Sequence, residues 1–129
     1  MAPSMGDCMT GVLVDTCGWV ALIKSGLNID SELAKIIGRP KLIVIDSVLE
    51  ELEDLAKQKR GLLLELLKSR CDIIEDPKGE RHTDKMLIKL SVSNKWPVLT
   101  VDTRLKEELA KSGCQYIEVV SDRMLRLIA

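Results

Sequence analysis

The chain has 129 residues, which is long enough for one domain with a real core, and its near-neutral balance of 19 basic and 20 acidic residues excludes nucleic-acid binding through an overall basic field. Hydrophobic residues make up 46% of the chain, but there is no Phe, so the core must be aliphatic. No apolar run approaches the roughly 20 residues of a membrane span. The four cysteines form no CxxC pair and His82 is the only histidine, which argues against a structural zinc site and favours reduced thiols. We therefore expect a cytoplasmic protein without a membrane segment, with a flexible tail over residues 1–10 and a single domain over residues 11–129.

Strands and helices alternate along the predicted domain. In chain order the apolar runs and helical stripes predict a strand at 11–14, helices at 16–24 and 29–37, a strand at 41–45, helices at 46–56 and 62–67, a strand at 71–74, a helix from 83, a strand at 96–101, a helix at 103–111 and a strand at 115–120. Asp30 or Ser31 is the expected cap of the second helix. Ser47 and Glu50 have the spacing of a capping box, and Thr83 is expected to cap its helix.

The end of the chain, residues 121–129, fits either a last helical turn or a short pairing strand. Before it, the polar loop 75–81 carries Pro77 and Gly79 and is the segment that we expect to move most. The alternation of strands with helices predicts a mainly parallel sheet of about four to five strands with helices on both faces.

Four carboxylates, those of Asp15, Glu51, Asp84 and Asp102, lie at the end of a predicted strand or one turn beyond it. If the strands are parallel, these ends meet at one edge of the sheet. Two carboxylates roughly 5 Å apart repel by about 3 kcal/mol at an effective dielectric constant near 20, so such a cluster needs a cation or bound protons. Oxygen ligands without His or Cys favour Mg²⁺ or Mn²⁺, which suit phosphodiester hydrolysis.

Each of these acids also has a purely structural interpretation. Asp102 precedes a helix and is a natural N-cap. Asp84 lies in a first helical turn, where the helix dipole favours a negative charge. Glu51 falls at the edge of an apolar helix face, as boundary residues often do. Asp15 is the hardest to explain in this way, because it ends an apolar strand.

The order of four segments, Val14-Asp15-Thr16, Val48 to Leu52, Thr83-Asp84 and Leu99 to Leu105, resembles the PIN-domain ribonucleases from about residue 11 to residue 120. The resemblance implies a three-layer α/β/α sandwich and cleavage of RNA that depends on a divalent metal ion, Mg²⁺ or Mn²⁺. It implies that Asp15, Glu51, Asp84 and Asp102 are both the catalytic and the metal-binding residues, with Thr16 and Thr100 as active-site support.

The same resemblance suggests partners for the protein. These are an RNA substrate, an antitoxin or RNA-processing partner, and a second copy of the chain in a homodimer. Four residues near the predicted acidic edge are candidate contacts for substrate phosphates: Arg81, His82, Arg104 and Lys106.

Two departures from the family pattern keep other functions open. Cys17 stands where PIN domains often carry Asn or Ser, and Val101 stands where a polar residue often precedes the last Asp. The alternative is a PIN-like module that binds RNA or a protein with little or no catalysis. A toxin and an RNA-processing nuclease are both compatible with the sequence. A phosphoacceptor receiver domain fits poorly, because the chain lacks the paired early acid and the late Lys that it needs.

Overall fold

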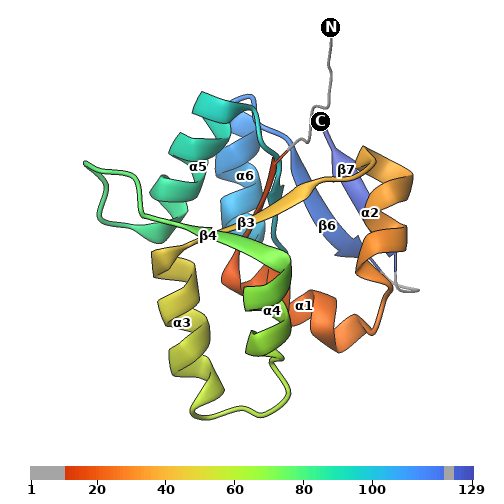
Figure 1. The fold of residues 1–129 in the computed structure, drawn as a ribbon. Helices are drawn as coiled ribbons and strands as arrows, with labels where there is room; N and C mark the ends of the chain where they lie inside the picture. The colour runs from red at the N-terminus through yellow and green to blue at the C-terminus, as the bar shows by residue number, and fades with distance from the viewer. Residues whose placement is uncertain (1–10, 121–123) are drawn as a thin grey trace, which may run out of the picture.

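The computed structural model describes residues 11–120 and 124–129, so the predicted tail over residues 1–10 lies outside the described part (Figure 1). Helices and strands alternate, in the order β2 (Gly11–Val14), α1 (Thr16–Ser25), α2 (Ile29–Ile37), β3 (Lys41–Ile45), α3 (Asp46–Ala56), α4 (Leu64–Arg70), β4 (Cys71–Ile74), α5 (Thr83–Asn94), β5 (Val98–Leu99), α6 (Thr103–Lys111), β6 (Tyr116–Val120) and β7 (Met124–Ile128). None of the helices in these two ranges is long and apolar enough to span a bilayer.

The strands form one six-stranded sheet in the order β4-β3-β2-β5-β6-β7. Every neighbouring pair is parallel except β6 and β7, which run antiparallel with Glu118 opposite Arg126. The mainly parallel sheet with helices around it confirms the predicted fold class. The sheet is wider than the four to five strands expected, because the end of the chain pairs as a strand.

The helices lie in two layers because the chain winds outward from β2 in both directions. It first passes through β3 and β4 on one side, then returns to β5 and continues to β6 on the other. Right-handed crossovers place the helices of the two halves on opposite faces of the sheet. In Figure 1, α5 and α6 accordingly lie together, apart from α3 and α4. The direction of winding changes between β2 and β5, where open α/β sheets bind ligands.

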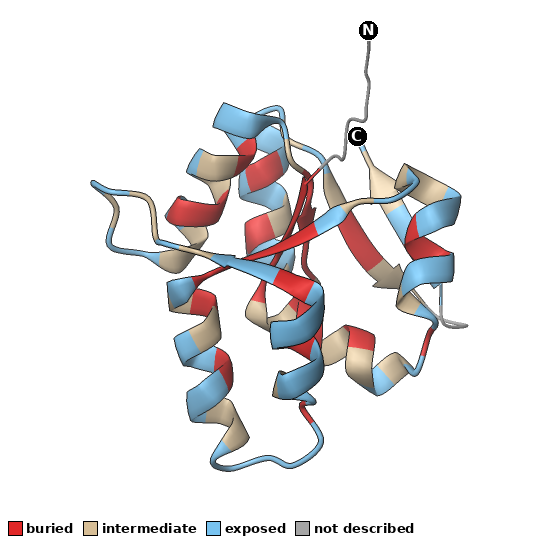
Figure 2. Ribbon diagram, viewed as in Figure 1, coloured by how far each residue is buried: buried red, intermediate tan, exposed pale blue. Residues whose placement is uncertain are grey.

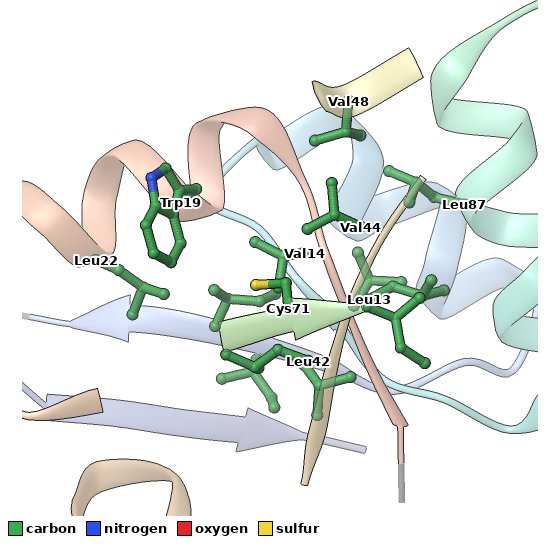
Figure 3. Packing of buried hydrophobic residues seen from close by; sticks show 14 of the residues in the cluster. Leu13, Val14, Trp19, Leu22, Leu42, Val44, Val48, Cys71 and Leu87 are labelled. Atoms are coloured by element: carbon green, nitrogen blue, oxygen red, sulfur yellow. The ribbon is translucent and has the colours of Figure 1, made fainter. Parts of the chain in front are cut away.

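The core is aliphatic, as the composition predicts. Figure 2 shows that the central strands are buried almost throughout, and Leu13 and Val14 of β2 have no exposed surface. Figure 3 shows Trp19 and Leu22 of α1 directed toward the side of the sheet that carries Val14. Trp19 is fully buried, and its indole N–H donates to the carbonyl oxygen of Leu62 at 2.7 Å. This bond satisfies the one polar group of the largest core side chain.

Three predicted helix caps are wrong. Helix α2 is capped by Asn28, whose side-chain oxygen accepts from the Ser31 amide at 2.9 Å, and not by Asp30 or Ser31. Thr83 is the first residue of α5 and does not cap it. The capping box does not form, because the Ser47 amide donates to Asp76 at 2.9 Å and its hydroxyl donates to the same carboxylate. The loop that carries Asp76 thus replaces Glu50 as the partner of Ser47.

The largest boundary differences from the prediction are at α4 and β5. Helix α4 begins at Leu64 because Leu63 takes a left-handed backbone conformation with φ of 52°. Strand β5 is short, but the residues before and after it, Pro97 and Thr100, also form backbone hydrogen bonds with the neighbouring strands. The Leu13 amide donates to the Pro97 carbonyl at 3.0 Å, and the Thr100 amide donates to the Ile117 carbonyl at 3.0 Å.

Candidate active site

The four predicted acids all line one cleft of about 580 Å³ at the carboxyl ends of the strands. They come from four separate parts of the chain. Asp15 follows β2, Asp102 follows β5, Glu51 lies on α3 and Asp84 lies in the first turn of α5. The cleft therefore opens where the winding of the sheet changes direction.

Asp15 is held more rigidly than the other acids. It is 6% exposed, and its Oδ1 accepts from the Thr16 amide at 2.8 Å, which caps α1. Its Oδ2 accepts from the Thr100 hydroxyl at 3.0 Å and lies 3.1 Å from the Cys17 sulfur. Donors to both oxygens fix the orientation of this buried carboxylate. The cap and the site therefore use the same side chain.

Thr100 connects the ends of the two central strands. Its side chain has no exposed surface, and its oxygen also accepts from the Asp102 amide at 3.1 Å. Asp102 in turn caps α6, with Oδ1 accepting from the Arg104 amide at 2.9 Å and the Leu105 amide at 3.4 Å. These cap bonds involve Oδ1 only, which leaves Oδ2 of Asp102 as the oxygen for a ligand.

Glu51 and Asp84 complete the group from the helices. Glu51 is exposed, and its Oε1 accepts from the hydroxyl of Thr16. Asp84 is half-buried. Burial raises the pKa of its carboxyl group, and so do the negative charges of Asp15, Asp102 and Glu51, while Arg104 opposes them. Asp84 therefore lies within electrostatic range of the other three carboxylates.

Gly18, in the first turns of α1, is a residue that the sequence analysis missed. A Cβ atom at this position would lie 2.2 Å from the carbonyl oxygen of Leu99, so only glycine lets α1 approach β5 this closely. This approach places Cys17 beside Thr100, with the Cys17 sulfur 3.3 Å from the Thr100 hydroxyl oxygen. The available signal is a glycine inside an otherwise helical pattern, where it is unfavourable unless packing requires it.

The family model described as a PIN-like domain matches residues 12–123. The chain belongs to the PIN-like domain family. It is also similar to the solved structure described as "Structure of the PIN domain endonuclease Utp24", with a TM-score of 0.74 and 19% sequence identity over 91% of this chain and 90% of that chain. At that identity the likeness shows a shared fold. No curated protein matches the sequence significantly.

The cleft of this PIN-like domain suits a hard divalent cation by the chemistry of its donors. Its lining offers carboxylate and hydroxyl oxygens and no histidine, and the Cys17 thiol in the lining lies against Asp15 and Thr100. Across residues 11–120 and 124–129, no three His, Cys, Asp or Glu side chains are already gathered into a ligand cage. Mg²⁺ does not need one, because it usually keeps several waters and binds through one or two carboxylates. The residues present therefore fit such an ion.

Three of the four predicted phosphate contacts lie beside the acids, and one does not. Arg81, His82 and Arg104 line a groove of about 620 Å³ that shares Glu51 and Asp84 with the cleft, together with Lys85, which was not predicted. Lys106 lines neither the cleft nor this groove. Its ammonium group instead lies 2.8 Å from the Glu118 carboxylate on β6. Lys24 of α1 does line the cleft and was also missed.

Proposed function

We propose that this PIN-like domain is an endoribonuclease that depends on Mg²⁺ or Mn²⁺ and cleaves RNA phosphodiester bonds. One observation supports the proposal most directly. Four acids from four separate elements line a single cleft at the switch point of the sheet, and three of them raise the pKa of the fourth. The parallel strands β2 and β5 alone bring Asp15 and Asp102 together, whereas Glu51 and Asp84 reach the same cleft from two further helices.

The residues of the cleft have distinct roles in this proposal. Asp15, Glu51, Asp84 and Asp102 hold the cation, and Thr100 and Thr16 fix the carboxylates that they contact. A bound divalent cation supplies Lewis-acid polarisation of the phosphodiester. The adjoining groove lies next to the acids, so its guanidinium groups, those of Arg81 and Arg104, bind the flanking phosphates.

Two biological uses are compatible with this activity, a toxin held by an antitoxin and an RNA-processing nuclease. A small antitoxin gene beside this one would identify the first. We also propose that the protein acts in the cytoplasm as a homodimer, and sedimentation of the purified protein tests the oligomeric state.

The decisive experiment combines thermal unfolding with RNA cleavage. Mg²⁺ and Mn²⁺ are expected to raise the Tm of the wild-type protein relative to EDTA, but not that of Asp15→Asn. The matched control is Asp54→Asn, because the Asp54 side chain is 77% exposed and does not line the cleft. Cleavage of structured RNA in Mn²⁺ should be lost with Asp15→Asn and kept with the control.

The opposite result would favour a different function. If millimolar metal leaves both melting curves unchanged and RNA stays intact, the acids are caps and boundary residues. The protein is then a PIN-like binding module, as the departures at Cys17 and Val101 allow.

A further inference from the structure

Helix α1 has two different apolar faces. Trp19 and Leu22 point into the core, as Figure 3 shows. A second stripe lines the cleft and follows the helical spacing i, i+3, i+4 and i+7, with Cys17, Val20, Ala21 and Lys24. The outward face of a surface helix is ordinarily polar, so an aliphatic stripe ending in a lysine beside an acidic cluster calls for a ligand.

Along helix α3 the residues that line the cleft also change from acidic to aliphatic. Glu51 lies among the acids, and Leu55, one turn further along the same face, lies on the aliphatic side of the cleft. Helices α1 and α3 contact each other. The cleft therefore has an acidic end at the sheet and an aliphatic floor made by Val20, Ala21 and Leu55, with Lys24 on the same side. Its volume of about 580 Å³ lies within the range of ligand pockets.

We propose that this aliphatic floor holds a guanine base of the RNA, on the nucleotide next to the cleaved phosphate, and that Lys24 selects that base. The inference rests on the proposed ribonuclease function. One helical turn, about 5.4 Å, separates Glu51 from Leu55, so a phosphate at the acids leaves the attached nucleoside over the floor.

The chemistry of Lys24 favours guanine over adenine. A lysine ammonium only donates hydrogen bonds. Guanine offers two adjacent acceptors, O6 and N7, whereas adenine places its N6 donor beside N7. Lys24 forms no ion pair with any residue in the described part of the chain, so its donors are available to a ligand.

Ring stacking is not the basis of recognition in this cleft. Single-stranded RNA is commonly held by bases stacked on aromatic side chains, which tolerate any base. Among the described residues no aromatic side chain lines the cleft, and the ring in the adjoining groove is that of His82, which lies outside the aliphatic floor. Aliphatic contact with the base, combined with hydrogen bonds to its edge, gives selectivity instead.

The test uses guanosine and adenosine as probes. Both nucleosides are neutral, carry no phosphate that would need a metal ion for binding, and contain no phosphodiester bond that the protein could cleave. Amide shifts of the full chain are followed by NMR during each titration. Shifts are expected at Val20, Ala21 and Leu55, with guanosine bound at least about fivefold more tightly than adenosine. Lys24→Met should make the two affinities equal. Lys111→Met, at an exposed lysine that lines neither the cleft nor the groove, should keep the preference.

Three results would each overturn the inference. They are equal affinities of the wild-type protein for guanosine and adenosine, amide shifts confined to other parts of the chain, and a preference for guanosine that survives Lys24→Met. Failure of the nuclease proposal has a different signature. A protein that binds guanosine on the floor but leaves RNA intact in Mn²⁺ keeps the nucleoside site and loses the nuclease function. A protein that cleaves RNA without a guanosine preference keeps the nuclease function and loses the inference.

Discussion

Gly18→Ala is the substitution whose effect the structure defines most sharply. The added Cβ would lie 2.2 Å from the Leu99 carbonyl oxygen and 2.9 Å from its carbon, both of which are backbone atoms that cannot rotate away. Carbon and oxygen atoms in close contact are normally about 3.3 to 3.6 Å apart, so α1 has to move outward by about 1 Å.

The expected loss of stability combines two opposing effects. Overpacking of this kind costs about 1 to 3 kcal/mol, while replacing glycine by alanine in a helix returns up to about 1 kcal/mol. We therefore expect Gly18→Ala to lower the free energy of unfolding by up to about 2 kcal/mol, as measured by urea denaturation in EDTA. Ala110→Gly, at an exposed position in α6, calibrates the helix contribution separately.

The effect of Gly18→Ala on activity should exceed its effect on folding. Movement of α1 separates Asp15 and Cys17 from Thr100, whose side chains now lie 3.0 to 3.3 Å apart. A displacement of about 1 Å at a catalytic site can lower the rate about 100-fold. Mn²⁺-dependent RNA cleavage measures this loss at a temperature where the variant is folded. If Gly18→Ala is as stable and as active as the wild-type protein, α1 does not depend on this close approach.

Three further predictions concern charge and buried hydrogen bonds. Asp84→Asn should raise the Tm in EDTA while abolishing cleavage. The pKa of Asp84 is raised, so the wild-type protein should gain stability as the pH falls from neutral through that pKa toward 3.8. Melting curves recorded at several pH values should show this gain in the wild-type protein and not in the variant. Thr100→Val should cost about 1 to 3 kcal/mol in urea denaturation, since the buried Asp15 carboxylate loses a donor, and a smaller loss would mean that water replaces the hydroxyl. Glu118→Gln should lower the Tm at pH 7 by weakening the ion pair with Lys106. Because the pKa of Glu118 is lowered, the difference in Tm between wild type and variant should disappear as the pH falls from 4.5 through that pKa. A difference that persists in acid would point to packing.

The positions of the acids were predictable because they depend on local patterns. An apolar run followed by an acid identifies Asp15 and Asp102 at the ends of strands, and the spacing of leucines on a helix places Glu51 at the edge of its apolar face. The parallel arrangement then brings them to one edge of the sheet. The alternation of strands and helices therefore suffices to predict that these acids meet at one end of the sheet.

The remaining features depend on contacts between segments far apart in the chain. Ser47 and Glu50 match a capping box, but a carboxylate from a later loop, that of Asp76, takes the hydroxyl. Lys106 follows the last acid closely, yet Glu118 on the neighbouring strand draws it away from the cleft. No local sequence pattern predicts that Asp76 or Glu118 takes part in these contacts, because each contact joins segments that are separated along the chain.

The two outer strands bear on how the protein behaves at high concentration. Strand β4 ends the sheet on one side with Ile73, which is 39% exposed, beside Asp72, which pairs with Lys41 at 2.6 Å. Strand β7 ends it on the other side with Arg126, which pairs with Glu118. A sheet from another molecule could extend either edge only by burying these charges. Both edge strands thus resist fibre-like growth, while the carboxyl ends of the strands, where the four acids lie, stay open at the cleft.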